Sequence, residues 1–371
     1  MYEVLRRGIN MKTQMIIPVI IPTFEPDERF LHILSELVMQ NIGPLIVVDD
    51  GSGMGYKDFF RKAEIIYHTT VLVHEVNKGK GRALKDAFQY CLENWPNMVG
   101  CITADSDGQH TSRSIMECRR ALLDNPSSLV LGVRNFLAEG KEQIPAKSMF
   151  GNRLTCRVLH RLYGIHITDT QTGLRAIPAE FMRYLLHIKG ERFEFETQML
   201  IETKREGISI CEVPIEIIYD SKDNHSTHFR PIVDSIRIYK LFGAEFGKFM
   251  LSGFSSAIVD LTLFGLFCRL LRSGMQAQGG YYIMLATISA RLISAVYNYS
   301  VNYFLVFKSR KKHIKSILKY VFVAVVQMIC SGVFTELFFR LLPVQTELAA
   351  KVPIDAILFL FSYIIQRRLV Y

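Results

Sequence analysis

Residues 101–110 read CITADSDGQH, an apolar run that ends abruptly in two carboxylates one residue apart. Met98–Ala104 is predicted to be a fully buried strand, because it is short, mostly apolar and followed by turn-forming residues. Asp105 and Asp107 would then lie at the carboxyl end of a strand, where ligands gather in open α/β sheets. Side chains two positions apart there can share one cation, and carboxylate oxygens suit Mg²⁺ or Mn²⁺. The pattern therefore indicates a metal site, although a lone Asp-x-Asp is also common in ordinary turns.

The composition divides the chain into a polar front and an apolar rear. Its 371 residues leave room for two domains, and a hydrophobic content of 49% is high for a soluble protein. From Phe249 onward charged residues thin out and long apolar runs begin. The formal net charge is +9, but no basic stripe with interleaved aromatic residues occurs, so nucleic acid is not an expected partner. Positive charge on cytoplasmic loops and at an anionic membrane surface accounts for it more simply.

The cysteines and the N-terminal residues both indicate the cellular compartment of the front domain. The seven cysteines are scattered, with no CxxC pair and no zinc-ligand spacing, which predicts buried thiols in a reducing compartment. The first residues lack a basic segment followed by a long apolar one, and the apolar run Met15–Pro22 is too short for a signal peptide. Both features predict a cytosolic front domain.

Five short apolar segments alternate with helical patterns in the front half of the chain. Strands at this spacing predict a mostly parallel sheet in an α/β fold. Polar clusters follow several of these strands at their carboxyl ends, where a nucleotide would lie. The predicted strands are Met15–Ile21, Leu45–Val48, Thr70–His74, Met98–Ala104 and Ser128–Val133.

Two of the polar clusters allow more than one interpretation. Asp49 and Asp50 could form a turn before a helix N-cap, or a carboxylate here could accept hydrogen bonds from a base or ribose. The segment Lys78–Arg82 could be a solvated basic turn or could lie near a diphosphate. It lacks the Walker pattern, and no GxGxxG follows the first strand, so neither a P-loop ATPase nor a Rossmann dehydrogenase is favoured.

Taken together and in this order, the polar segments resemble family 2 glycosyltransferases of the GT-A fold. The segments that carry this resemblance are 21–25 (IPTFE), 47–52 (VVDDGS), 77–81 (NKGKG), 105–110 (DSDGQH) and 132–134 (GVR). Residues 169–176 (DTQTGLRA) and 192–196 (RFEFE) are similar to the branch that contains dolichyl-phosphate mannose synthases and bactoprenol glucosyltransferases. The resemblance extends over residues 15–240. It is specific for the fold and the reaction type and unspecific for the sugar.

The resemblance implies a metal site and a catalytic set. Asp105, Asp107 and Gln109 would coordinate the divalent ion, Mg²⁺ or Mn²⁺. Arg134 would face the phosphates, and the sugar end of the pocket would be lined by Asp169, Gln171 and Gly173. The catalytic residues would then be Asp107, Arg134, Asp169 and Gln171.

The resemblance also implies which residues bind the two substrates. Residues at the ends of the first strands would hold a GDP- or UDP-linked sugar donor: Pro22, Thr23, Glu25, Asp50, Lys80 and Asp105. A second set would hold the phosphate of a polyprenyl acceptor: Lys147, Ser148, Arg153, Lys222, His228 and Arg230. For the last three the alternative is a polar linker before a helix, but in this enzyme branch a similar linker lies against the bilayer.

The rear of the chain is predicted to be a membrane domain. Residues 232–247 have the pattern of an interfacial helix, which separates a catalytic domain at 1–231 from the segment 248–371. That segment contains four apolar runs, each reaching the roughly 20 residues that span a bilayer. Core helices of a large soluble domain are the alternative, but four in succession are improbable. The runs are 249–271, 281–307, 318–342 and 349–369.

Basic residues predict how this domain is oriented. The loop 308–315 and the pair Arg367-Arg368 should be cytoplasmic, which places both termini and the catalytic domain on that side. With residues 291–295 (RLISA), 302–304 (NYF) and 363–367 (YIIQR) as its marks, the rear block resembles the small four-helix GtrA-like membrane proteins. The resemblance implies either a membrane anchor or a role in moving lipid-linked sugars. Formation of a homo-oligomer through this domain is a further alternative.

Two opposite charges are expected deep inside the membrane. Asp260 lies about eleven residues into the first predicted span and Arg291 about ten into the second, so at about 1.5 Å per residue both are near the midplane. Such charges normally face the interior of a helix bundle and find partners. We therefore expect Asp260 and Arg291 to approach one another, with Asp355 as the competing partner.

The sequence thus predicts a membrane-bound, metal-dependent, inverting hexosyltransferase. It would move one sugar from a nucleoside diphosphate to undecaprenyl or dolichyl phosphate on the cytoplasmic face of the membrane. The alternative is a lipid-linked sugar translocase whose front domain only recognises the headgroup. A processive polysaccharide synthase is disfavoured, because the Gln-x-x-Arg-Trp signature is absent.

Overall fold

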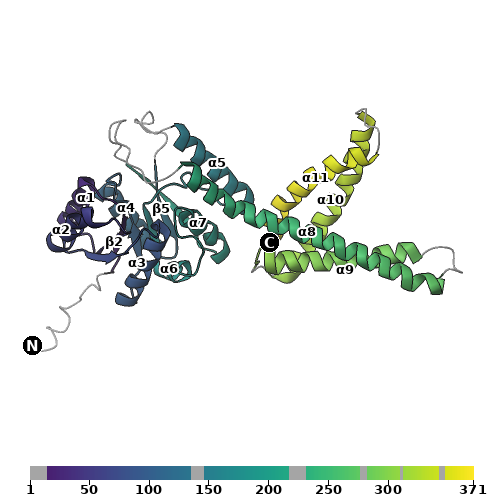
Figure 1. Cartoon of the computed structure of the whole chain (residues 1–371), viewed down its shortest axis with the longest axis horizontal. Coiled ribbons are helices and arrows are strands. Elements are labelled where there is room, and N and C mark those ends of the chain that lie inside the picture. The colour runs from purple at the N-terminus through teal and green to yellow at the C-terminus, as the bar shows by residue number, and fades with distance from the viewer. Residues whose placement is uncertain (1–14, 135–145, 217–230, 276–281, 310–311, 342–346) are drawn as a thin grey trace, which may run out of the picture. The chain divides into compact units, whose positions relative to one another are not determined.

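The computed structural model describes residues 15–134, 146–216, 231–275, 282–309, 312–341 and 347–371 (Figure 1). The chain divides into two units, which we call the sheet unit and the helical unit. The sheet unit comprises Met1–His160 and Ile165–Ile238, and the helical unit comprises Arg161–Gly164 and Tyr239–Tyr371.

The sheet unit contains one seven-stranded sheet with the strand order β3-β2-β1-β4-β6-β5-β7. β1 pairs in parallel with β2 and β4, β2 with β3, and β5 with β7, whereas β6 is antiparallel to both of its neighbours. The mostly parallel α/β sheet that the sequence predicts is confirmed, and the five predicted strands overlap β1 to β5. The strands are Val19–Thr23 (β1), Leu45–Asp49 (β2), Thr70–Val73 (β3), Gly100–Thr103 (β4), Leu129–Arg134 (β5), Arg175–Pro178 (β6) and Ile210–Ile215 (β7).

Helices cover both faces of this sheet, as is usual for strands that pair in parallel. On one face α1, α2 and α4 pack over a core in which the ring centroids of Phe30 and Phe60 are 6.0 Å apart. On the other face α3 packs against α6 and α7, and the ring centroids of Phe88 and Phe195 are 6.4 Å apart (Figure 1). The helices are Glu28–Met39 (α1), Lys57–Tyr67 (α2), Lys80–Asn94 (α3), Ser112–Asp124 (α4), Ala146–Tyr163 (α5), Ala179–Leu185 (α6) and Glu194–Glu206 (α7).

The carboxyl ends of the first strands meet at one edge of the sheet, and the antiparallel β6 adds its amino end there. The Asp50 N–H donates to the Thr23 carbonyl oxygen at 2.9 Å, which joins the ends of β1 and β2. The Thr103 hydroxyl donates to the Gly173 carbonyl oxygen at 2.8 Å, across 70 residues of sequence. The segment before β6 therefore lies beside the residues that follow β4.

The described part of the helical unit contains α8 from Tyr239 onward, α9 to α11 and two π-helical turns. The four predicted apolar runs overlap these elements. Among the described residues, one helical segment, Ile236–Leu271 within α8, is long and apolar enough to cross a membrane. The predicted interfacial helix and first span lie on this one helix without a break. The elements are Pro231–Met275 (α8), Tyr282–Val301 (α9), Asn302–Val306 (η4), His313–Leu341 (α10), Glu347–Ile365 (α11) and Gln366–Val370 (η5).

The predicted approach of Asp260 and Arg291 is confirmed. A terminal guanidinium nitrogen of Arg291 on α9 lies 3.6 Å from Oδ2 of Asp260 on α8. The Ser294 hydroxyl, also on α9, donates to Asp260 Oδ1 at 2.9 Å. The Asp260 side chain is 18% exposed and that of Arg291 74% exposed, so it is the carboxylate that faces the neighbouring helix.

We expect Asp260→Asn and Arg291→Gln each to lower the stability of the detergent-solubilised protein, because each leaves one charge without its partner. The double variant should recover part of the loss, with a coupling of about 0.6 to 1.7 kcal/mol, as found for polar pairs between membrane helices. Unfolding of the native protein, both single variants and the double variant in one detergent measures this coupling. Strictly additive losses would contradict it.

Candidate active site

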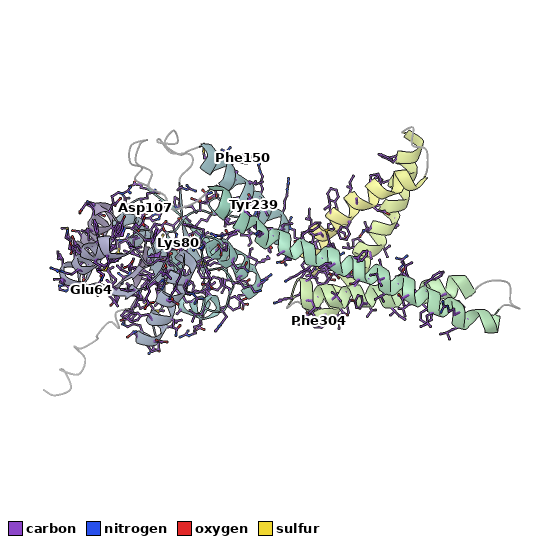
Figure 2. The ribbon with its side chains drawn as sticks, viewed as in Figure 1. Glu64, Lys80, Asp107, Phe150, Tyr239 and Phe304 are labelled. Atoms are coloured by element: carbon purple, nitrogen blue, oxygen red, sulfur yellow. The ribbon has the colours of Figure 1, made fainter. Side chains whose placement is uncertain are left out.

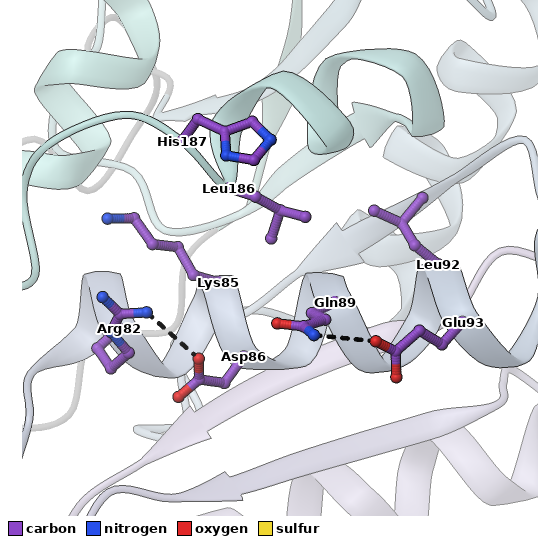
Figure 3. A pocket seen from close by; sticks show the side chains of 8 residues that line it. All are labelled: Arg82, Lys85, Asp86, Gln89, Leu92, Glu93, Leu186 and His187. Carbon is purple, nitrogen blue, oxygen red and sulfur yellow. Dashed lines mark hydrogen bonds and ion pairs between the residues drawn. The ribbon is translucent and has the colours of Figure 1, made fainter.

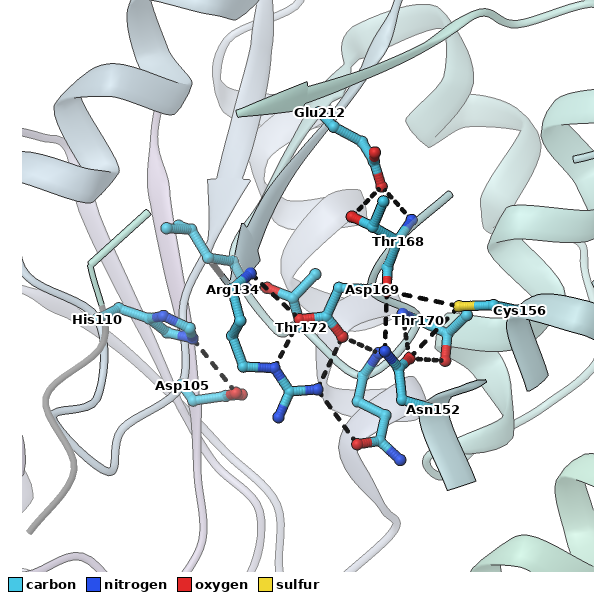
Figure 4. A network of polar contacts seen from close by, with 12 residues as sticks. Asp105, His110, Arg134, Asn152, Cys156, Thr168, Asp169, Thr170, Thr172 and Glu212 are labelled. Atoms are coloured by element: carbon cyan, nitrogen blue, oxygen red, sulfur yellow. Dashed lines mark hydrogen bonds and ion pairs between the residues drawn. The ribbon is translucent and has the colours of Figure 1, made fainter. Parts of the chain in front are cut away.

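A cluster of charges lies where the end of β4 meets the start of α3, in the region where Figure 2 labels Lys80 and Asp107. Lys80 Nζ lies 2.7 Å from Oδ1 of Asp105 and 3.0 Å from Oε1 of Glu196, which is on α7. His110 Nε2 lies 3.6 Å from the other oxygen of Asp105 (Figure 4). One ammonium group therefore bridges two carboxylates that come from different elements.

The members of this cluster shift one another's pKa. Burial alone would raise the pKa of Asp105 and lower that of Lys80, but their attraction outweighs it. The pKa of Asp105 is held well below its usual range by Lys80 and His110. The pKa of Lys80 is raised by the charges of Asp105 and Glu196. Asp105 and Lys80 are therefore both charged at neutral pH.

Asp107 differs from Asp105 in its surroundings. Burial and the negative charge of Asp105 raise the pKa of Asp107, and its Oδ1 accepts from the Gln109 N–H at 3.1 Å. A divalent cation would relieve the repulsion between these two carboxylates. In the described part of the chain no group of three His, Cys, Asp or Glu side chains is arranged to hold a metal ion. Further oxygen ligands would have to come from the Gln109 amide or a substrate. With them, the set of ligand atoms fits Mg²⁺ or Mn²⁺.

Gly173 packs directly against the Asp105 carboxylate. A Cβ at position 173 would lie closer than 3.0 Å to all three atoms of the carboxylate group. The Gly173 backbone is fixed there by the hydrogen bond from Thr103 described above. A glycine is therefore required at this position for the carboxylate to keep its place.

Arg134 and Asp169 form a second group at the same edge (Figure 4), and Gln171 joins them. Arg134, the last residue of β5, donates from Nε to Asp169 Oδ2 at 2.6 Å and from a terminal nitrogen to Asp169 Oδ1 at 2.8 Å. The same terminal nitrogen lies 3.2 Å from the Gln171 amide oxygen. Asp169 is fully buried. This bidentate pair fixes the plane of the Arg134 guanidinium.

Asn152 on α5 holds the turn that carries Asp169. Its amide oxygen accepts from both the N–H and the hydroxyl of Thr170, each at 2.8 Å, and its amide nitrogen donates to the Thr168 carbonyl oxygen at 2.9 Å. On the other side of the turn, Glu212 on β7 accepts from the Thr168 N–H at 2.6 Å. The turn is thus bound from two elements, which positions Asp169 for Arg134.

The predicted donor residues lie at the ends of β1 and β2. The Glu25 N–H donates to the Ser52 hydroxyl at 2.9 Å, and Glu25 itself is exposed with a positive φ of 50°. Thr23 is buried, and Pro22 before it is half-buried. Asp50 is also buried, and its carboxylate accepts from backbone N–H groups of the turn that precedes α3.

The predicted acceptor residues are described only in part. Arg153 is exposed on α5. Lys147 and Ser148 also belong to α5, but their side chains are not described. Lys222, His228 and Arg230 lie outside the described residues. The acceptor site stays a prediction.

Sequence reasoning missed three polar residues that shape this edge: Glu196, Asn152 and His74. Glu196 belongs to the segment 192–196 that carries the family resemblance, and Asn152 belongs to the helix α5. A polar residue on the apolar face of such a helix is a signal that could have found Asn152. His74 and Glu196 gave no such signal, because their partners are distant in sequence.

A hollow on the sheet unit borders this region through Asp86, the partner of His74 (Figure 3). It is lined by α3 and by the residues that follow α6, and none of the predicted site residues contributes to it. Its lining residues are Arg82, Lys85, Asp86, Gln89, Leu92, Glu93, Leu186 and His187.

Comparison with known proteins identifies both parts of the chain. Residues 19–185 match the family described as glycosyl transferase family 2, and residues 248–371 match the GtrA/DPMS transmembrane domain. A UDP-N-acetylglucosamine--dolichyl-phosphate N-acetylglucosaminyltransferase of Methanococcus voltae is 26% identical over 218 residues, which are 55% of this chain and 86% of that protein. An uncharacterised protein of Methanocaldococcus jannaschii is 28% identical over 202 residues, which are 54% of this chain and 81% of that protein.

Among solved structures, the chain is similar to glucosyl-3-phosphoglycerate synthase from Mycobacterium tuberculosis. The identity is 18% and the TM-score 0.45, over 62% of this chain and 77% of that one. The two family matches, rather than this likeness, decide the assignment. The chain is a glycosyltransferase in which residues 19–185 belong to glycosyl transferase family 2 and residues 248–371 to the GtrA/DPMS transmembrane family.

Proposed function

We propose that the protein transfers one hexose from a nucleoside diphosphate sugar to a polyprenyl phosphate at the cytoplasmic face of a membrane. The observation that carries this proposal is the edge of the sheet where Lys80, Asp105 and Asp107 gather. Similarity to a dolichyl-phosphate sugar transferase and the transmembrane-domain match support a lipid acceptor.

On the donor side, some residues hold or supply positive charge, and others hold those residues in position. Asp105, Asp107 and the Gln109 amide would hold Mg²⁺ or Mn²⁺, which when bound offsets the negative charge of the departing diphosphate. Lys80 supplies a fixed positive charge at the start of α3, and Arg134 presents a guanidinium whose plane Asp169 sets. Such preorganised charges stabilise a leaving group without rearranging during the reaction.

On the acceptor side, the reaction needs little catalytic help from protein side chains. A phosphate monoester is already anionic at neutral pH, so its oxygen can attack the anomeric carbon without a general base. Binding the two substrates in line then lowers the barrier together with the charges described above. Direct displacement would invert the anomeric centre. The acceptor phosphate would be held by residues on α5 and in the segment before α8: Lys147, Ser148, Arg153, Lys222, His228 and Arg230.

The membrane arrangement is proposed from the sequence. Four spans with both termini in the cytoplasm would keep the catalytic domain on the side where nucleotide sugars are made.

The second candidate function is translocation of the lipid-linked sugar by the GtrA/DPMS domain. The charge pair of Asp260 and Arg291 on α8 and α9 favours keeping this candidate, since ionisable residues within membrane segments often mark transport paths.

One assay tests the proposed function directly. Membranes containing the protein are incubated with a panel of radiolabelled UDP- and GDP-sugars and a polyprenyl phosphate, and the label in the extracted lipid is counted. We expect one donor to label the lipid, and membranes with Asp107→Ala protein to label it at least about 100-fold more slowly. Absence of label with every donor, while a preformed lipid-linked sugar still crosses a proteoliposome membrane, would favour the translocase.

Arg230→Ala should raise the KM for polyprenyl phosphate by about 10-fold or more while changing the KM for the sugar nucleotide little. The reason is its position in the basic segment before α8, because a hydrogen bond to a charged phosphate is worth about 1.5 to 3 kcal/mol. Steady-state kinetics with each substrate varied in turn measures both constants. Arg113→Ala, an exposed arginine paired with Glu117 on α4, is the control. A change in the donor KM alone would show that Arg230 does not bind the acceptor.

A further inference from the structure

His74, the residue after β3, is buried between two carboxylates. Its Nδ1 lies 2.7 Å from Asp50 Oδ1, and its Nε2 lies 3.0 Å from Asp86 Oδ2. The side chains of His74 and Asp50 are 6% and 5% exposed, and that of Asp86 is 34% exposed. A carboxylate oxygen accepts hydrogen bonds, so each contact is a hydrogen bond when the ring nitrogen that makes it carries the proton.

The Asp50 carboxylate has a second set of partners in the backbone. Its Oδ1 accepts from the Lys78 N–H at 2.9 Å, and its Oδ2 accepts from the Gly79 N–H at 2.8 Å. Gly79 is the N-cap of α3, and its φ of 102° is one that residues with a Cβ rarely adopt. No side chain of the cap residue closes this end of α3. The Asp50 carboxylate is therefore the group that fixes the turn from which α3 starts.

Lys80 follows this turn directly. The position of its backbone determines whether its ammonium can reach Asp105 at 2.7 Å. On its other side the turn is held by the Arg192 guanidinium, which donates to the Asn77 side chain at 3.2 Å. The turn is thus clamped between the Asp50–His74 pair and the segment before α7.

We propose that His74 is a positioning residue of the donor site. It holds the Asp50 carboxylate so that the turn at Lys78 and Gly79 presents Lys80 to the diphosphate of the sugar nucleotide. Asp86 in turn orients the imidazole, and its other oxygen lies 3.5 Å from Arg82 on the same helix (Figure 3). This inference rests on the proposed function, since it names how the donor site of that reaction is built.

Asp50 has a second role in this arrangement. Its two oxygens accept three hydrogen bonds from the protein, and a carboxylate has about four acceptor positions, so one remains for a base or a ribose. Asp50 therefore also acts on the donor through the backbone of the turn. If the buried pair only stabilised the fold, substitutions of His74 would not weaken donor binding selectively.

Three substitutions of His74 distinguish a positioning role in the donor site from a role in stability alone. His74→Asn keeps an N–H close to the position of Nδ1, which faces Asp50, whereas His74→Gln keeps one close to Nε2, which faces Asp86. His74→Leu removes both at similar volume. Binding of UDP and GDP to the full-length protein in detergent with Mg²⁺ is measured by calorimetry, together with KM for the donor and for polyprenyl phosphate. His32→Leu, at an exposed histidine on α1, is the matched control.

We expect His74→Leu and His74→Gln to weaken nucleotide binding by about 10-fold or more and to raise the donor KM in parallel. His74→Asn should stay within about threefold of the native protein, and the KM for polyprenyl phosphate should hardly change in any variant. If His74→Leu does not fold, the comparison of Asn with Gln decides alone, and equal nucleotide binding by these two would overturn the inference. Native protein that binds neither UDP nor GDP would instead overturn the proposed function, and the inference with it.

Discussion

Asp107→Ala should lower kcat for sugar transfer by about 100- to 1,000-fold, the size of effect seen when one electrostatic contact to a transition state is lost. Asp107 carries a carboxylate whose pKa is raised by burial and by its neighbour Asp105, and removing it weakens the proposed metal site. EDTA should give the same loss in the native enzyme, and added Mg²⁺ or Mn²⁺ should restore activity. Initial rates at saturating donor and acceptor measure each effect.

Two comparisons make this prediction specific. Asp124→Ala, at an exposed aspartate that ends α4, should leave the rate unchanged. Binding of Mn²⁺ to the purified protein, followed by its electron spin resonance signal, should weaken in Asp107→Ala and not in Asp124→Ala. Undiminished transfer by Asp107→Ala in metal-free buffer would end the metal assignment.

Gly173→Ala should cost about as much activity, for a steric reason. The added Cβ would overlap the Asp105 carboxylate, which must then move away from Lys80 and from the metal site. We expect a loss of about 100-fold or more in kcat/KM for the donor, and overpacking of this kind typically destabilises by about 1 to 3 kcal/mol. Kinetics and thermal unfolding in detergent measure the two effects. Gly55→Ala, where a Cβ meets no atom within 4 Å, is the control.

A double variant tests the cause of that loss. In an Asp105→Ala background the carboxylate is gone, so Gly173→Ala should destabilise much less than it does in the native protein. An equal loss of stability in both backgrounds would mean that the methyl group disturbs something other than Asp105.

The sequence was sufficient for β1 to β5 and for the residues that follow them. Each of these strands is a short apolar segment stopped by polar residues, so local composition alone marks both the strand and the functional end. β6 and β7 were not predicted. β6 begins with Arg175, whose guanidinium is fully buried and donates to the carbonyl oxygens of Thr172 and Glu196. β7 contains Pro214, which a strand tolerates best at the edge of a sheet.

Within the site, sequence predicted the residues that have local signatures and missed those that depend on distant partners. Asp105 and Asp107 stand one residue apart after a strand, which is visible without any structure. Glu196 and His74 have ordinary sequence surroundings, and only the fold brings them to Lys80 and to Asp50. The long helix α8 is a similar case, because the sequence suggested an interfacial helix and a separate span where the chain continues as one helix.

The pairing of β7 with β5 sets a limit on where the protein can be divided. β7 lies beyond residue 185, where the match to glycosyl transferase family 2 ends, and it pairs with β5 from Leu129 opposite Ile210 to Arg134 opposite Ile215. A recombinant fragment that stops at residue 185 would leave one side of β5 with unpaired N–H and carbonyl groups along an apolar strand. Such strands recruit other copies of themselves. A fragment meant for soluble expression should therefore extend past Ile215, or it will aggregate before it can be assayed.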